Sequence, residues 1–197
     1  DLSDINVALG TAILNNSGIQ LLADIVLDRD LEIREGTIII DAGGYSLQAY
    51  DKDVLILEEA EVTFKQLKAS ISFVVGHNAL ATFEAVTFEG GNLCKPALQL
   101  FDSAKVAMSD CTFLHNNTDM PMYREAAIKI ISTRNPDHAP DLERPFHDYD
   151  RSASLDAGDG VRLGLKNCTI NGWMYSRSDF DLSLAGVDCE LTSHARF

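Results

Sequence analysis

Residue types that can bind a ligand lie close together in one stretch, residues 132–160, which reads STRNPDHAPDLERPFHDYDRSASLDAGDG. It offers charge, hydrogen-bonding groups and a ring for sugar stacking, on Arg144, His147, Asp148, Tyr149 and Arg151. Loops of this length without hydrophobic periodicity are usually functional or disordered. We therefore predict a loop at 132–158 that forms the wall of a binding groove. The alternative is a solvated loop, or one that packs on a neighbouring subunit.

Two aromatic residues further along the chain form a second candidate. Trp173 and Tyr175 lie in the segment NGWMYSRSDF. An exposed indole and a phenol ring side by side can form a flat platform for a substrate. The alternative for this pair is a packed turn.

Other kinds of site lack their sequence patterns. The chain contains no G-x-S-x-G, no glycine-rich phosphate loop and no H-E-x-x-H. The four cysteines have no zinc-ligand spacing, and the five histidines are dispersed. We therefore predict neither a resident cofactor nor a metal centre.

The composition predicts one globular domain, residues 1–197. The sequence has 197 residues, of which 46% are apolar, and this is enough to bury one core. Its net charge of -14 repels phosphate polymers and anionic bilayers, so we expect neither nucleic acid nor a membrane surface as partner. No apolar run is long enough to cross a bilayer, and the sequence starts at Asp1, so we expect a soluble, processed piece of a protein.

Five segments repeat one pattern of apolar and polar residues, and this pattern predicts the elements that would position a site. They are VTFKQLKA (62–69), ATFEAVTF (81–88), VAMSDCTF (106–113), RLGLKNCTI (162–170) and LSLAGVDC (182–189). The first shared apolar column reads Phe64, Phe83, Met108, Leu165, Leu184; the second reads Leu67, Val86, Cys111, Cys168, Val187; the third reads Ala69, Phe88, Phe113, Ile170, Cys189. The residue before the second column is Asp, Asn or Gly in three segments, which predicts a sharp corner between two short strands. We predict that the cysteines are free thiols that act as small hydrophobes.

The spacing of these segments indicates strands that stack rather than pair by hairpins. The first column advances by 19, 25, 57 and 19 residues, with no helical pattern between the segments. Each strand then pairs with its counterpart one turn of chain away. Further β-prone runs occur at 23–27, 31–33, 36–40, 45–49, 54–57, 73–75, 97–101 and 126–131. We predict an all-β solenoid of roughly seven coils, about 35 Å long at a strand spacing of about 4.8 Å.

The two ends of this solenoid are expected to differ. Residues 3–18 read as a capping α-helix with Ser3 as N-cap and with Ile5, Leu9 and Ile13 on one face. Such a helix would cover the open strand edges of the first coil. No comparable element follows the last repeat, so we expect that the C-terminal end either has a thin cap or joins another copy of the chain.

The stretch IQLLADIVLDRDLEIREGTIIIDAGGYSLQA, together with MSDCTF and LKNCTI, resembles right-handed parallel β-helix proteins of the pectate-lyase-like superfamily. The resemblance covers nearly all of the chain outside 132–158. It implies a right-handed parallel β-helix. The superfamily includes polysaccharide lyases, glycoside hydrolases, phage tailspikes and adhesive surface domains, so the resemblance leaves the activity open.

For a lyase, the resemblance implies a Lys or Arg base and often carboxylate ligands for Ca²⁺. Arg144 or Arg151 would then be the catalytic base, and Asp148, Asp150 or Asp156 could bind Ca²⁺. A hydrolase of the polygalacturonase kind is disfavoured, because the NTD at 117–119 lacks its companion motifs.

We expect a secreted or cell-surface module that binds a polysaccharide or surface glycan, or mediates adhesion, without a complete catalytic set. The first alternative is a lyase acting on an acidic polysaccharide. The second is a structural segment of a phage tail or surface appendage, which could form homo-oligomers through its C-terminal end.

Overall fold

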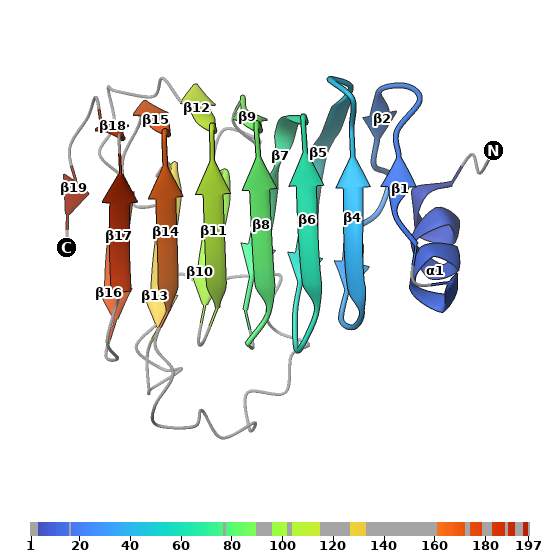
Figure 1. Ribbon diagram of the computed structural model, residues 1–197, viewed down its shortest axis with the longest axis horizontal. Helices are drawn as coiled ribbons and strands as arrows, with labels where there is room; N and C mark the ends of the chain where they lie inside the picture. The colour runs from blue at the N-terminus through green and yellow to red at the C-terminus, as the bar shows by residue number, and fades with distance from the viewer. Residues whose placement is uncertain are drawn as a thin grey trace.

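The computed structural model describes residues 4–15, 17–76, 78–89, 96–101, 104–114, 127–132, 161–171, 174–178, 183–187, 189–191 and 195–196. Within these ranges the chain forms one α-helix, α1 (Ile5–Asn15), and two sheets whose strand pairs are all parallel. Sheet A has, in spatial order, β1 (Ile19–Gln20), β4 (Thr37–Asp41), β6 (Glu61–Lys65), β8 (Leu80–Glu84), β11 (Lys105–Ser109), β14 (Arg162–Lys166) and β17 (Ser183–Val187). Its strands lie side by side in chain order, with α1 beside β1 at one end (Figure 1).

Sheet B has two arms joined by two long strands, β5 (Ser46–Ile56) and β7 (Lys68–Val75). The first arm contains the early parts of β5 and β7 with β2 (Ile25–Val26), β9 (Thr87–Phe88), β12 (Thr112–Leu114), β15 (Thr169–Asn171) and β18 (Glu190–Leu191). The second arm contains their later parts with β3 (Leu31–Ile33), β10 (Leu98–Phe101), β13 (Ile128–Ser132), β16 (Met174–Ser178) and β19 (Ala195–Arg196).

The chain passes from each strand of sheet A into sheet B and then returns to the next strand of sheet A. We call one strand of sheet A, with the sheet B strands that follow it, a tier. Each tier pairs with the next in register, as Phe64 opposite Phe83 and Phe83 opposite Met108 illustrate. The parallel stacking expected from the repeat spacing is therefore present.

The core lies between the sheets and is built from the inward positions of each strand. Alternation puts Phe64 and Phe83 inside, where their rings stack with centroids 5.5 Å apart. Phe88 and Phe113 of the next column also stack, at 4.2 Å, and Phe73 meets Phe64 edge to face at 5.0 Å. These five side chains are fully buried. Stacked rings in equivalent positions of successive tiers hold the register by shape as well as by burial.

The sharp corner predicted between the repeated strands is present in four of the five segments. Gln66, Ala85, Asp110 and Asn167 have φ of 50°, 54°, 55° and 51°, which is the left-handed region. Each lies between a strand of sheet A and the first arm of sheet B, so a left-handed residue turns the chain there. The Asn167 side chain donates a hydrogen bond to Oδ1 of Asp110 at 2.6 Å, which links two successive corners.

The fifth segment is aligned differently from the sequence prediction. The structure places Leu165 opposite Gly186 and Leu163 opposite Leu184, a shift of two residues. Gly186 therefore lies inside β17 and is not the corner residue. The sequence interval of 19 residues matched the first interval and favoured the wrong pairing.

The N-terminal helix is shorter than the predicted 3–18, and Asp4 caps it in place of Ser3. The Asp4 carboxylate accepts a hydrogen bond from the Asn6 backbone N–H at 2.8 Å, as an N-cap does. Ile5 and Leu9 are buried as predicted, and Ile13 is partly buried beside them. The helix has 11 residues, and no helix among the described residues is long and apolar enough to cross a membrane.

Candidate functional site

Most of the side chains singled out from the sequence lie outside the described residues. These are Arg144, His147, Asp148, Tyr149, Arg151 and Trp173, together with the 132–158 loop beyond Ser132. Tyr175 is described by its backbone, which lies in β16 in register with Lys129 of β13 and Arg196 of β19. Their assignment to a site therefore stays a prediction.

The outer face of sheet A is a flat floor of small side chains. Because side chains alternate along a strand, the middle residue of each five-residue strand points outward. In the order of the tiers, these floor residues are Ile39, Thr63, Thr82, Ala107 and Gly164. Ala107 is exposed, Ile39 keeps 45% of its surface exposed, and the other three are half-buried. The floor therefore has no bulky side chain over β11 and β14.

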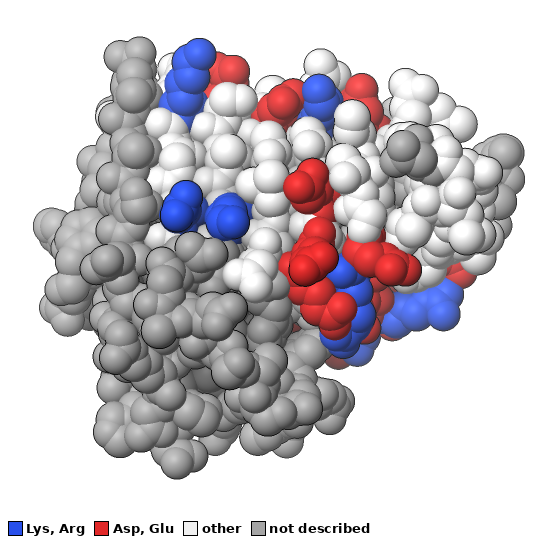
Figure 2. Space-filling view, turned by 60° about the horizontal axis from the view of Figure 1, so that its bottom comes forward, with Lys and Arg blue, Asp and Glu red and all other residues white. Residues whose placement is uncertain are grey.

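Two rows of mostly polar side chains flank the floor, and three of their four basic residues lie on these two strands, β11 and β14. The row at the strand starts reads Thr37, Glu61, Leu80, Lys105 and Arg162; the row at the strand ends reads Asp41, Lys65, Glu84, Ser109 and Lys166. Figure 2 shows two basic groups next to each other on the left of this face, an uncharged strip above them, and acidic and basic groups mixed towards the right. We call Lys105, Arg162 and Lys166 the basic patch.

The geometry of the basic patch follows from the strand register. Lys105 pairs with Arg162, so their Cα atoms are one strand spacing apart, about 4.8 Å. Lys166 ends the strand that Arg162 begins, and four residues of strand separate them by about 13 Å. The patch therefore has two neighbouring cations on one side of the floor and one on the other.

Among the described residues, few carboxylates of this face lie close to the basic patch. Glu61 lies three strands away from Arg162 in sheet A, about 14 Å, which exceeds the Debye length of about 8 Å at physiological salt. Glu84 is closer, but the Lys65 ammonium lies 2.9 Å from its carboxylate. Asp110 is hydrogen-bonded to Asn167 beside Lys166 and offsets part of that charge. Lys105 and Arg162 lie at the opposite ends of β11 and β14 and are therefore farther than Lys166 from this carboxylate.

The outward side of the second arm of sheet B is not an open surface. Leu55, Val74 and Phe101 point outward there by alternation, yet each is at most 5% exposed, and they form a second apolar cluster with Leu57. Lys129 on the same side is only 5% exposed. Strands that are buried on both faces are mostly apolar, and β7 is apolar without interruption over residues 73–75.

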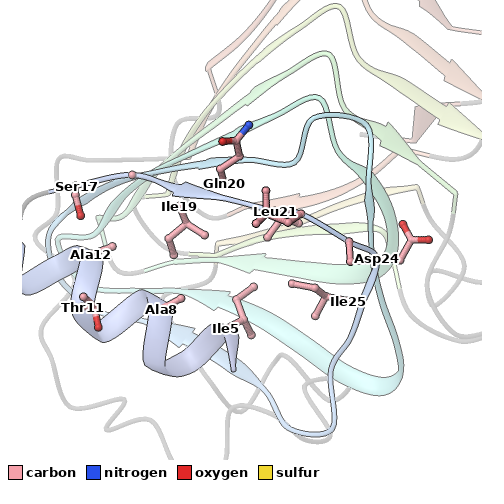
Figure 3. A pocket seen from close by; sticks show the side chains of 13 residues that line it. Ile5, Ala8, Thr11, Ala12, Ser17, Ile19, Gln20, Leu21, Asp24 and Ile25 are labelled. Atoms are coloured by element: carbon pink, nitrogen blue, oxygen red, sulfur yellow. The ribbon is translucent and has the colours of Figure 1, made fainter. Parts of the chain in front are cut away.

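A pocket of about 490 Å³ lies between α1 and the first tier (Figure 3). Ile5, Ala8 and Ala12 of the helix face Ile19 and Leu21 across it. Asp24 is the one charged residue among the described lining, and its carboxylate already accepts a hydrogen bond from the Ser46 backbone N–H at 2.7 Å. This bond lowers the pKa of Asp24 below its ordinary value. The pocket is apolar and gives a sugar few hydrogen-bond partners.

A metal centre with three or more protein ligands does not occur in the part of the chain that the structure describes. No group of three or more His, Cys, Asp or Glu side chains there could hold a metal ion. Asp148, Asp150 and Asp156, the residues considered for Ca²⁺, lie outside the described residues.

Lys105, Arg162 and Lys166 were not predicted as site residues, because residue types that carry chemistry are denser in the 132–158 loop. The signal was present in the repeats KVAMS (105–109) and RLGLK (162–166). Once Met108 and Leu165 are aligned as inward residues, two positions in each segment point outward. The first is three residues earlier, at Lys105 and Arg162, and the second is one residue later, at Ser109 and Lys166. The first position is basic in both segments, and the second is Lys166 in the later one.

Comparison with known proteins adds no relative: no family model, no curated protein and no solved structure matches the sequence.

Proposed function

We propose that the tiers are the coils of a right-handed parallel β-helix of about seven coils, as in the pectate-lyase-like superfamily. Three observations support this proposal. All strand pairs in the described residues are parallel, each strand of sheet A is followed in the chain by strands of sheet B, and left-handed residues recur at one corner.

We further propose that the protein is a secreted or cell-surface module that binds an acidic polysaccharide across the outer face of sheet A. The observation that carries this proposal is the pairing of Lys105 with Arg162 beside the floor residues Ala107 and Gly164. The small floor residues let a sugar ring approach the sheet closely. The two cations supply charged hydrogen bonds to its carboxylate or sulfate groups.

The two rows of side chains that flank the floor indicate the direction in which a bound glycan lies relative to the strands. The floor and its flanking rows run across the strands, and equivalent positions repeat about every 4.8 Å. A polymer that lies along the floor meets the same backbone geometry in each tier. Among the described residues, it meets two neighbouring cations over β11 and β14, so we expect its acidic groups to be held there.

The test is a binding titration of the full chain with polygalacturonate, with a neutral glucan as the comparison polymer. Lys105→Gln and Arg162→Gln should each weaken binding about two- to fivefold, since exposed charged contacts contribute about 0.5–1 kcal/mol. Binding should also weaken as salt is added. Lys65→Gln is the matched control, because it removes the same charge from the same face but from an ammonium already paired with Glu84.

Two results would contradict this function. The first is equal binding of the acidic and neutral polymers, and the second is equal losses from Lys105→Gln and Lys65→Gln. Absorbance from an unsaturated uronide product during the incubation would instead support the lyase alternative. Assembly of the chain into oligomers, with no glycan bound, would favour the structural-segment alternative.

A further inference from the structure

Three cysteines occupy one column at the corner between sheet A and the first arm of sheet B. Cys111 lies opposite Cys168, because Ser109 pairs with Lys166 before them and Thr112 pairs with Thr169 after them. Both residues are 1% exposed and are free thiols. Extending the register from Thr169 and Glu190 by one residue places the exposed Cys189 next to Cys168.

The two buried sulfurs have the same environment, one tier apart. The Cys111 thiol lies 3.4 Å from the Phe83 carbonyl oxygen and 3.3 Å from that of Ser109. The Cys168 thiol lies 3.7 Å from the Met108 carbonyl oxygen and 3.3 Å from that of Lys166. Phe83 and Met108 are register partners, and so are Ser109 and Lys166. The sulfurs are therefore displaced by one strand spacing, about 4.8 Å.

This spacing suits a bridging ion better than a direct bond. A disulfide needs Cβ atoms about 3.8 Å apart, so the two strands would have to approach by about 1 Å. A metal–thiolate bond is about 2.3 Å long, and two such bonds in line span about 4.6 Å. An ion that prefers two sulfurs in a line therefore fits between Cys111 and Cys168 without moving the sheet.

We propose that Cys111 and Cys168 form a binding site for one soft monovalent cation of the Cu(I) class. Two sulfur–metal bonds form, one S–H bond breaks, and its proton leaves to solvent. The oxidation state of the ion does not change. The product, one thiolate and one thiol around a single positive charge, is neutral, as a buried site requires.

The chemistry of the ligands selects this class of ion. Sulfur ligands favour soft cations, whereas hard cations need oxygen ligands. Val86 occupies the same column one tier earlier and is fully buried, so water is excluded beside the sulfurs. The exposed Cys189 provides a route of entry by exchange from thiol to thiol.

The experiment uses the reduced full chain in a Cys94→Ser background, without oxygen, with Ag(I) as the probe ion. An excess of a small monothiol competes for silver, so that single cysteines lose the ion and a two-sulfur site retains it. Native mass spectrometry counts the retained ions, and ultraviolet absorbance follows the silver–thiolate bonds. We expect one retained ion per chain.

Cys189→Val should keep the ion and only slow its loading. In this Cys189→Val background, which also removes the neighbouring pair Cys168 and Cys189, Cys111→Val and Cys168→Val should each abolish retention. Valine is the residue that this column already contains at Val86, so both variants keep the core filled, and circular dichroism checks that they fold. If either fails to fold, the corresponding Cys→Ala variant replaces it. No ion retained by the parent, or one ion retained by both buried-site variants, would overturn the proposal.

Discussion

Replacing Ala85 with glycine should stabilise the protein, although glycine normally weakens a strand-rich structure. Ala85 is the corner residue between β8 and β9, with φ of 54°. In this region the Cβ of an L-residue crowds the following carbonyl, which costs about 1–2 kcal/mol. Glycine has no Cβ and is free of this cost.

The net gain is the strain relieved less the extra entropy of the unfolded chain. Glycine in place of alanine makes the unfolded state more favourable by about 0.4–1 kcal/mol. The Ala85 side chain is exposed, so the loss of its methyl group removes little packing. We therefore expect a gain of about 0.5–1 kcal/mol, or a rise in Tm of about 1–4 °C for a chain of this length.

Urea unfolding followed by circular dichroism measures this change, with Ala107→Gly as the matched control. Ala107 is also exposed, but it lies inside β11 and is absent from the left-handed residues of the described chain. There the same substitution should destabilise by about 0.5–1 kcal/mol. Equal destabilisation by both variants would refute the reasoning about the corner.

Three further outcomes can be measured. Phe88→Ala should lower the free energy of unfolding by about 3–5 kcal/mol, because it leaves a cavity beside Phe113, whose ring stacks on Phe88 with 4.2 Å between centroids. Urea titration measures this change, and a decrease as small as that from a substitution at an exposed site would contradict the prediction. The Asp24 carboxylate has a pKa below its ordinary value of 3.8, so its contribution to stability is present above pH 3.8 and is lost as pH falls through the lower pKa of the folded state. Between pH 5 and the acid limit, Asp24→Ala should therefore lose less stability than the parent protein in urea titrations. Identical pH profiles of the two proteins would count against this. Gly164→Trp should weaken polygalacturonate binding about tenfold, because the indole ring would cover the floor of sheet A. The free energy of unfolding should not change, since a Cβ at this position lies 3.9 Å from the Val106 carbonyl oxygen, an ordinary contact. Unaltered affinity would show that the glycan binds elsewhere.

Much of the fold could be predicted because residues that align between the sequence repeats are also the residues that pair between neighbouring strands. Phe64, Phe83, Met108 and Leu165 align in the sequence and pair in the sheet. Local patterns sufficed there, since an inward apolar residue and a left-handed corner recur at fixed offsets. The last repeat was misaligned because LSLAGVDC offers apolar residues at several offsets, and only hydrogen bonding to β14 selects one.

The candidate site was harder to predict, because its residues are far apart in the sequence. Lys105 and Arg162 become neighbours only when β11 pairs with β14. Sequence reasoning favoured the dense cluster around Arg144 and Tyr149, where chemistry-bearing residues are adjacent in the chain. In a stacked fold, proximity along the chain and proximity on the surface are nearly independent.

The pairing of β11 with β14 across a long connection bears on how such a protein can evolve. Asp110 and Asn167 meet at successive corners although 57 residues separate them, compared with 19 between Gln66 and Ala85. The entropy of closing the longer loop exceeds that of the shorter by only about 1 kcal/mol. The pairing of the strands in the two sheets therefore depends only weakly on the length of chain between β13 and β14. A new segment could be inserted, exchanged or deleted there at small thermodynamic cost, which makes this connection the natural place for the protein to acquire a new specificity while its scaffold stays the same.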